Sequence, residues 1–236
     1  MGIAVVTGAA SGIGMALARR LATRGYQVHL VDVAATADLA TQLGGVGHTA
    51  DVASTEDMER VALAAEEAEI VCLNAGIVGA SLGVPWQVPN AEWQRMWAVN
   101  VLGVVNGLHA FAPRMSARRR GQILITGSLA GLVTFPGGGA YAATKHAVVA
   151  LAESASLALQ GTSVTVTLAC PALVRTGMSE VGADPDHVAA EALAAADDGR
   201  FLVVPAEWAP AVVGRAERLV SGAVPEVPTS RGESAG

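Results

Sequence analysis

The sequence has little cysteine, no excess of positive charge and no long uninterrupted apolar run. Its two cysteines, Cys72 and Cys170, fall in or at the end of apolar segments typical of buried strands. We therefore expect reduced packing residues rather than a disulfide. The formal net charge of -6 would repel the phosphates of nucleic acid or of an anionic lipid surface. Nucleic acid is thus not an expected partner.

No segment predicts a membrane span. The most apolar long stretch, residues 96–113, is interrupted by Asn100, Asn106 and His109. These side chains would be costly in hydrocarbon but suit a helix packed against a sheet or another subunit. The N-terminus has no basic segment before an apolar one, because a strand-like run begins at Ile3. These features predict a cytoplasmic protein.

The chain also lacks a Pro/Ser-rich linker, an internal repeat and a low-complexity segment, while 52% of its residues are hydrophobic, enough for a large core. Strand-like and helix-like segments alternate along it, which predicts one α/β domain over residues 1–223. Residues 224–236 contain Pro225 and Pro228 and end in small polar residues. We expect a flexible C-terminal tail there.

Apolar runs and turn residues locate the elements. Strands are expected near residues 3–7, 27–32, 47–51, 69–73, 122–126, 163–169 and 201–204. Helices are expected near residues 12–24, 54–67, 90–118, 141–160 and 185–196, with shorter ones ending near 43 and 219. The one over residues 90–118 can contain one break. Ser54 and Asn90 are the expected N-caps of two of them. Apolar strands that alternate with helices imply a parallel sheet covered on both faces and joined by right-handed crossovers.

A glycine-rich loop, TGAASGIG at residues 7–14, follows the first strand. In it, Gly8 permits a tight turn, Gly12 lets a phosphate approach the backbone, and Gly14 allows close helix packing. The helix that follows offers free N–H groups to a pyrophosphate. The spacing G-x-x-x-G-x-G differs from G-x-G-x-x-G, and a glycine-rich turn can also serve packing alone.

Asp32 strengthens the nucleotide interpretation, because it ends the second strand 18 residues beyond Gly14. An acidic residue near this offset binds the adenosine ribose hydroxyls. The alternative role of Asp32 is a helix N-cap, and the two are compatible. The following residues, Val33, Ala34 and Ala35, provide no cation for a 2′-phosphate. Because like charges about 4 Å apart repel by roughly 1 to 4 kcal/mol, we expect NAD rather than NADP.

Tyr141 and Lys145 are four residues apart, with Ser128 upstream. On a helix, positions i and i+4 share a face, so the phenol and the ammonium can lie side by side. A phenol titrates near 10, so its use as a base near neutral pH needs about 3 to 4 kcal/mol of stabilisation of the phenolate. A neighbouring cation is the direct means. Each residue alone has an ordinary structural explanation, but their occurrence with the glycine loop favours catalysis.

With these residues, the chain resembles members of the short-chain dehydrogenase/reductase family over nearly its whole length. The resemblance rests on the glycine loop and Asp32, and on Asp51-Val52, Asn74-Ala75-Gly76, Asn100, Ser128 and Tyr141-x-x-x-Lys145. It implies a single-domain Rossmann-type fold, in which a doubly wound parallel sheet of about seven strands has helices on both faces.

The resemblance also implies the roles of the site residues. Tyr141 would be the general acid/base and Ser128 would hold the substrate oxygen. Lys145 would stabilise the phenolate and bind the nicotinamide ribose, while Asn100 would keep a water for proton relay. Thr176 would bond the carboxamide. The residues assigned to the cofactor are Gly8, Ser11, Gly12, Ile13, Gly14, Asp32, Asp51, Val52, Asn74, Ala75, Gly76, Tyr141, Lys145, Pro171, Val174 and Thr176. No metal is expected.

The implied activity is NAD(H)-dependent interconversion of a secondary alcohol and a ketone, in a homotetramer or, next, a dimer. Epimerisation or dehydration on the same scaffold, and a non-catalytic NAD-binding regulator, remain alternatives. Leu73 and Ala172 depart from the family pattern, and the segment 177–185, where the family has its lid, looks short. Core packing accounts equally well for the apolar residues that would line the pocket of a small to medium, apolar substrate. These are Trp86, Leu129, Phe135, Met178 and Val181.

Overall fold

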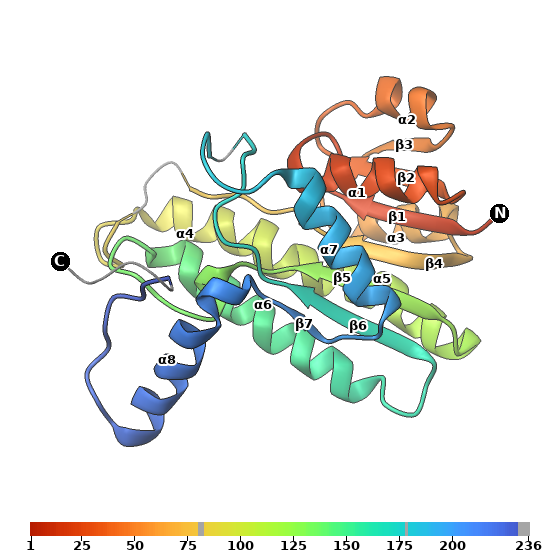
Figure 1. The fold of residues 1–236 in the computed structure, drawn as a ribbon. Helices are drawn as coiled ribbons and strands as arrows, with labels where there is room; N and C mark the ends of the chain where they lie inside the picture. The colour runs from red at the N-terminus through yellow and green to blue at the C-terminus, as the bar shows by residue number, and fades with distance from the viewer. Residues whose placement is uncertain (80–82, 178, 231–236) are drawn as a thin grey trace.

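The computed structural model describes residues 1–79, 83–177 and 179–230. Within them, a parallel seven-stranded sheet has the order β3-β2-β1-β4-β5-β6-β7 (Figure 1). The strands are β1 (Ile3–Thr7), β2 (Gln27–Asp32), β3 (Val46–Thr49), β4 (Ala68–Leu73), β5 (Gly121–Thr126), β6 (Val164–Ala169) and β7 (Leu202–Val203). The predicted single-domain, doubly wound sheet is confirmed.

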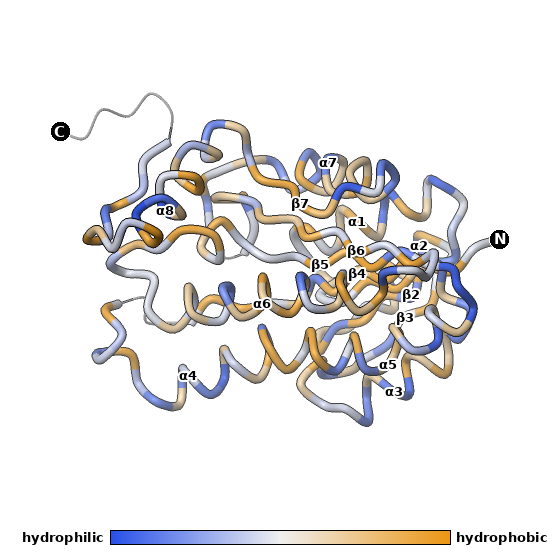
Figure 2. Tube along the Cα trace, turned by 90° about the horizontal axis from the view of Figure 1, so that it is seen from below, coloured by the Kyte–Doolittle hydropathy of each residue, from blue (hydrophilic) through white to orange (hydrophobic). Residues whose placement is uncertain are grey.

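Helices form a layer on each side of the strands, as Figure 2 shows. One layer contains α3 (Thr55–Ala64), α4 (Asn90–Trp97), α5 (Gly103–Arg118) and α6 (Gly139–Ala158). The other contains α1 (Gly12–Thr23) and α7 (Pro185–Asp197), with α2 (Ala37–Leu43) near the β3 edge. No helix among the described residues is long and apolar enough to cross a membrane.

Two apolar cores separate the sheet from its helical layers. Successive side chains of a strand point to opposite faces, and β1 shows this directly. Val5 is buried in the core that α3, α5 and α6 cover, whereas Ala4 and Val6 are buried in the core that α1 and α7 cover. On β4, Val71 and Ile70 divide in the same way. Helices cover both faces of the sheet, so consecutive residues of a strand are all buried and must be apolar.

Strand order reverses between β1 and β4, since β1 pairs with β2 on one side and with β4 on the other. In such sheets the crevice beyond the carboxyl ends of the strands, at the point of reversal, is where ligands bind. The glycine loop follows β1, Asp32 ends β2, and residues 74–76 follow β4. The topology therefore gathers the predicted cofactor residues at one edge.

The bounds of β1 and β2 match the sequence prediction, and Ser54 caps α3 by accepting the Asp57 N–H at 3.1 Å. The third strand begins and ends earlier than the predicted 47–51, because its pairing with β2 stops where Asp32 meets Thr49. Helix α3 also ends short of 67, since the chain turns through Ala65 to enter β4.

The helix predicted over residues 90–118, for which one break was allowed, needs one correction, at its N-cap. Its N-cap is Pro89, whose carbonyl accepts the N–H groups of Glu92 and Trp93, so Asn90 is the first helical residue and not the cap. Between α4 and α5, the π-helical turn η1 (Ala98–Leu102) interrupts the regular α-helix. Such turns insert a local irregularity and are frequent at functional sites.

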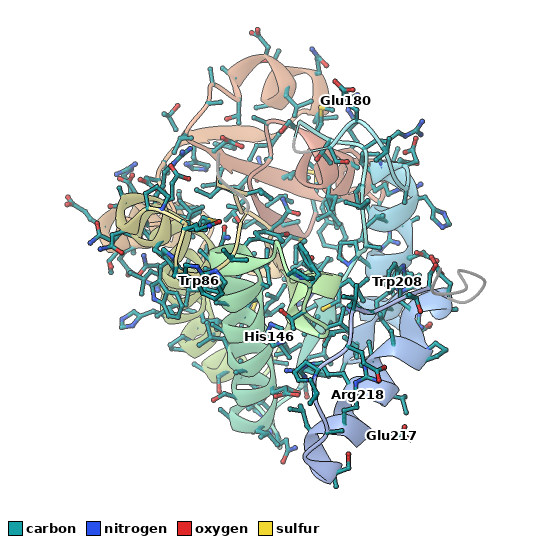
Figure 3. All side chains as sticks on the ribbon, turned by 90° about the vertical axis from the view of Figure 1, so that its left-hand side faces the viewer. Trp86, His146, Glu180, Trp208, Glu217 and Arg218 are labelled. Atoms are coloured by element: carbon teal, nitrogen blue, oxygen red, sulfur yellow. The ribbon has the colours of Figure 1, made fainter. Side chains whose placement is uncertain are left out.

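The C-terminal helix α8 (Ala209–Ser221) has no buried residue, and Figure 3 shows Glu217 and Arg218 on it. After it, residues 222–230 have no regular secondary structure, and Glu226 forms an ion pair with Arg218 at 3.2 Å. Residues 231–236 of the predicted tail lie outside the described residues. The assignment of residues 224–236 to a flexible tail stays a prediction.

Candidate active site

The glycine loop adopts backbone conformations that require its glycines. Gly8 and Gly12 have φ angles of +66 and +54, in the left-handed region that other residues rarely adopt. A Cβ on Gly14 would overlap the carbonyl oxygen of Gly8, so the start of α1 lies directly against the loop. Gly8 therefore forms the tight turn and Gly14 allows the close helix packing that the sequence predicts, and the approach of a phosphate to Gly12 stays a prediction.

The first turn of α1 is open to an acceptor. Ser11 is the N-cap in extended conformation, but its side chain makes no capping hydrogen bond. The first N–H groups of a helix have no partner within the helix, so here they remain for another acceptor. Ile13 packs partly buried against the core under α1, which anchors this turn. Backbone donors at a helix N-terminus suit a phosphate.

Asp32 ties β2 to the glycine loop. One carboxylate oxygen accepts the Ala10 N–H at 3.0 Å, and the other accepts the Ala34 N–H at 3.0 Å. The N-cap of α2 is Thr36, so the alternative role of Asp32 as a helix cap is wrong. The carboxylate still faces the crevice, because Asp32 lines the cleft described below.

The segment after β4 is fastened to β1 by side-chain hydrogen bonds. The Thr7 hydroxyl accepts the N–H groups of Asn74 and Ala75 at 2.9 and 3.0 Å. The Asn74 amide donates to the Thr7 carbonyl at 3.0 Å and accepts from the Thr126 hydroxyl at 3.0 Å. This holds Asn74, Ala75 and Gly76 beside the loop. Leu73, which departs from the family pattern, is buried in the core under α5.

A cleft of about 410 Å3 lies at this edge. Six of its lining residues were predicted from the sequence, namely Gly8, Asp32, Asp51, Val52, Ala75 and Gly76. The structure adds Val33, Ala50, Ala53, Ile77, Arg95, Ala98 and Val99. We call this the adenosine cleft, after the half of a dinucleotide that Asp32 and Asp51 are expected to contact. Of the added residues, Arg95, Ala98 and Val99 lie one to five residues before Asn100 on α4 and η1, and no motif in the sequence marked them.

Tyr141 and Lys145 lie side by side on α6, as their spacing predicts. The Lys145 ammonium is 5.8 Å from the centroid of the Tyr141 ring and donates to the Thr126 carbonyl at 3.2 Å. Lys145 is only 4% exposed. A Cβ on Gly76 would lie 3.3 Å from the lysine nitrogen. Because Gly76 has no side chain, the space between residues 74–76 and the Tyr141/Lys145 pair is left open.

Ser128 follows β5 and is buried beside α6. It is the N-cap of the 3-10 turn η2 (Leu129–Gly131), and its hydroxyl oxygen accepts the Ala130 N–H at 3.1 Å. Its own O–H can still donate to another oxygen. At Gly131 a Cβ would be crowded against the Lys145 backbone, so this turn packs tightly on the helix that holds the Tyr/Lys pair.

Asn100 lies in the π-helical turn and joins three parts of the site. Its Oδ1 accepts the Ile77 N–H at 2.8 Å, and its Nδ2 donates to the Ile77 carbonyl at 2.9 Å and to the Thr144 hydroxyl at 3.1 Å. Thr144 in turn donates to the Tyr141 carbonyl at 2.8 Å. Sequence reasoning missed Thr144, although its position between the tyrosine and the lysine was a signal.

The predicted nicotinamide segment follows β6. Pro171 accepts the Leu129 N–H at 2.8 Å, and Val174 is buried. A Cβ on Gly12 would lie 2.9 Å from the methyl group of Thr176, so this segment passes over the glycine loop. Farther along, the Ala183 carbonyl accepts the Arg175 N–H at 2.9 Å. The short lid at residues 177–185 stays a prediction. Met178 lies outside the described residues.

The predicted substrate-lining residues separate into two groups. Leu129 is buried, whereas Phe135, Trp86 and Val181 are 37%, 82% and 63% exposed. Figure 3 shows Trp86 beside the first turns of α6. There, Tyr141 packs against a small apolar cluster built around Val88, Met96 and Ala140. The described residues contain no group of three or more His, Cys, Asp or Glu side chains that could hold a metal ion.

The cysteines are free and buried, and burial raises the pKa of the Cys72 thiol to about 12 and that of the Cys170 thiol to about 11. They are therefore unreactive packing residues, as the sequence predicts.

Comparisons with known proteins agree with this arrangement. A family model described as short chain dehydrogenase matches residues 2–185. A 1-deoxy-11-beta-hydroxypentalenate dehydrogenase of Streptomyces exfoliatus is 38% identical over 213 residues, covering 85% of this chain and 77% of that protein. A 2-(R)-hydroxypropyl-CoM dehydrogenase of Xanthobacter autotrophicus is 32% identical, covering 81% and 82%. A Burkholderia phymatum short chain dehydrogenase/reductase solved in complex with NAD is 30% identical, with a TM-score of 0.88 and coverage of 97% and 98%.

Proposed function

The chain belongs to the short-chain dehydrogenase family, and we propose that it is an NAD(H)-dependent enzyme that interconverts a secondary alcohol and a ketone. The observation that carries the proposal is the position of the Lys145 ammonium, which faces the Tyr141 ring and borders the space above Gly76. A proton-transfer pair next to a nucleotide-sized cleft suits chemistry on a C–OH group.

The residues present fit a dinucleotide. The first turn of α1 offers N–H donors to a pyrophosphate, because the Ser11 side chain does not cap it. In the adenosine cleft, Asp32 and Asp51 provide acceptors for hydroxyl and amino groups. When bound, NAD would supply the nicotinamide ring that accepts or returns the hydride.

NAD is favoured over NADP. Asp32 lines the cleft, and its exposed neighbour Val33 has no charge to offset it. A 2′-phosphate next to this carboxylate would be repelled by roughly 1 to 4 kcal/mol. The complex of the Burkholderia protein with NAD supports the same choice of cofactor.

The chain's own residues then move the proton. In oxidation, the Tyr141 phenolate takes the hydroxyl proton of the alcohol, and in reduction the Tyr141 hydroxyl returns it to the carbonyl oxygen. Lys145 stabilises the phenolate through its charge, and the Ser128 O–H donates to the substrate oxygen. Asn100 holds Ile77 and Thr144 in place and keeps a water for exchange of the proton with solvent. Together these residues position the substrate and stabilise the charge that develops during the reaction.

The substrate is proposed to be small to medium and apolar. Trp86, Phe135 and Val181 are exposed apolar side chains, and Trp86 lies near the helix that holds Tyr141. By their names, the two dehydrogenases reported above act on 1-deoxy-11-beta-hydroxypentalenate and on 2-(R)-hydroxypropyl-CoM, so related chains accept quite different alcohols. A screen of ketones and secondary alcohols at 340 nm, with both cofactors, would identify the substrate class.

The decisive experiment replaces Tyr141 with Phe. Loss of general acid/base catalysis should lower kcat by a factor on the order of 100 to 10,000, with little change in the Kd for NADH. The chain has two tyrosines, so Tyr26→Phe is the matched control and should keep full activity. Full hydride transfer in Tyr141→Phe would refute the proposal. Turnover without any net change in NADH absorbance would indicate an epimerase or a dehydratase instead.

We also propose a cytoplasmic homotetramer, with a dimer as the next choice. Trp97, Leu102 and Val105 are exposed apolar residues on the long α4–α5 helix, and they support burial of this surface by another subunit. Light scattering that found only monomer at micromolar concentration would contradict the tetramer.

A further inference from the structure

One guanidinium lines the adenosine cleft among the residues that the structure describes, and it belongs to Arg95. Arg95 lies on α4, and Val99, four residues later, lies in η1. Both line the cleft, so they share the face of the helix that looks into it. Arg95 therefore stands one turn from Val99, at the same wall of the cleft.

Arg95 is held weakly by the protein. Its side chain is 62% exposed, and its ion pair with Glu92 is long, at 3.9 Å. Exposed ion pairs of this kind contribute little and leave the side chain mobile. The carboxylates of the cleft do not fix it either, since Asp32 accepts the Ala10 and Ala34 N–H groups and Asp51 accepts the Ala53 N–H. The guanidinium is thus available to a ligand.

The rest of the cleft suits a flat aromatic ring with donor groups on its edge. Its walls are mostly small or apolar, with Val52, Ala53, Ile77 and Val99 among them. The acceptors are carboxylates, which suit hydroxyl and amino donors. A planar guanidinium adds a different interaction, because it stacks on the face of an aromatic ring.

We propose that Arg95 closes over the outer face of the adenine and determines much of the affinity for the adenosine half of the cofactor. The inference rests on the proposed function, since it assumes that the cleft binds a dinucleotide. It concerns binding alone. Arg95 has no part in the transfer of the proton or the hydride, because that transfer takes place at the nicotinamide end of the cofactor.

The test compares Arg95→Ala and Arg95→Lys with the wild-type protein, by calorimetry and by competition against NADH. Stacking on an exposed ring has a modest effect, so the Kd values of NADH, ADP-ribose and adenosine should all rise roughly three- to tenfold in Arg95→Ala. Reduced nicotinamide mononucleotide, which lacks the adenosine, should bind unchanged, and kcat at saturating NADH should not move. Arg95→Lys should be intermediate, because the ammonium is not planar.

Two further variants separate the ligand contact from a general effect. Arg215→Ala on α8 removes a guanidinium elsewhere and should change no Kd. Glu92→Gln breaks the ion pair but keeps the guanidinium, and it should not weaken binding.

Three outcomes would overturn the inference. Unchanged Kd values in Arg95→Ala would do so, and so would loss of affinity in Glu92→Gln that equals the loss in Arg95→Ala. A loss for ADP-ribose without a loss for adenosine would assign the guanidinium to a phosphate rather than to the adenine. Failure of the wild-type protein to bind NADH at all would instead refute the proposed function, so the two failures are distinguishable.

Discussion

A histidine pair at the β2–β3 edge, one ring buried and the other half-buried, makes the stability of the fold depend on pH. The rings of His29 and His48 stack with centroids 5.1 Å apart, and their facing nitrogens are 2.9 Å apart. His29 is 4% exposed. Burial, and next the charge of His48, lowers the pKa of His29 from 6.5 to about 4. Burial and the nearby Arg60 also lower the pKa of His48. Both rings are therefore neutral in the folded protein at pH 7.

The sign of the effect follows from which state binds the proton. Between pH 6.5 and about 4, the unfolded chain takes up a proton at His29 and the folded chain does not. The stability that comes from keeping His29 neutral is thus fully present above pH 6.5 and is lost as the pH falls toward 4. For one such group, the loss is about 2 kcal/mol at pH 5 and about 3 kcal/mol at pH 4. This is a sizeable part of the roughly 5 to 15 kcal/mol that stabilises a typical domain.

Urea unfolding at pH 7.5, 6.0 and 5.0, at one protein concentration, measures this loss. His29→Gln cannot take up the proton, so its free energy of unfolding should fall less between pH 7.5 and 5.0 than that of the wild type, by about 2 kcal/mol. The matched control is His187→Gln, at a 67% exposed side chain on α7, which should follow the wild type. An identical pH dependence in the wild type and His29→Gln would refute the reasoning.

Three other substitutions test the site. Gly14→Ala forces a methyl group into the carbonyl oxygen of the loop, so NADH binding should be lost and the melting temperature should fall by several degrees, whereas Gly83→Ala enters open space and should do neither. The double change Asp32→Ser with Val33→Arg should shift the ratio of kcat/KM for NADP over NAD upward by about tenfold or more, and unchanged kinetics with both cofactors would remove Asp32 from that role. Thr144→Val removes the hydroxyl bonded to the π-turn asparagine and should lower kcat about tenfold at an unchanged Kd for NADH; an unchanged kcat would show that this contact does not position the site.

Local signals predicted the elements and most of the cofactor edge. The apolar runs located β1 and β2, and Ser54 was the cap of α3 because capping depends on neighbours in the chain. The spacing of Tyr141 and Lys145 predicted their common face for the same reason. The Pro89 cap was missed. Pro89 has the non-helical backbone of an N-cap, with φ -58 and ψ 143, and Asn90 is already the first helical residue.

Contacts between distant parts of the chain were beyond the sequence. The Asp32 carboxylate binds the Ala10 N–H only because β1 and β2 are paired, and Asn100 meets Ile77 and Thr144 only because a π-helical turn is packed against both. The position of Thr144 between Tyr141 and Lys145 is a local signal, but no pattern in the sequence indicates that Asn100 is its partner, or that Ala10 is the partner of Asp32.

By itself, the sequence determined the alternation of strands and helices, the glycine loop and the Tyr/Lys face, because each depends on steric and hydrogen-bonding preferences within a few residues. Only the tertiary structure decided that Arg95 would enter the adenosine cleft and that His29 would be buried against His48. Those outcomes depend on which elements the sheet order brings together. The desolvation and contacts that follow are properties of the packed chain and of no single segment of it.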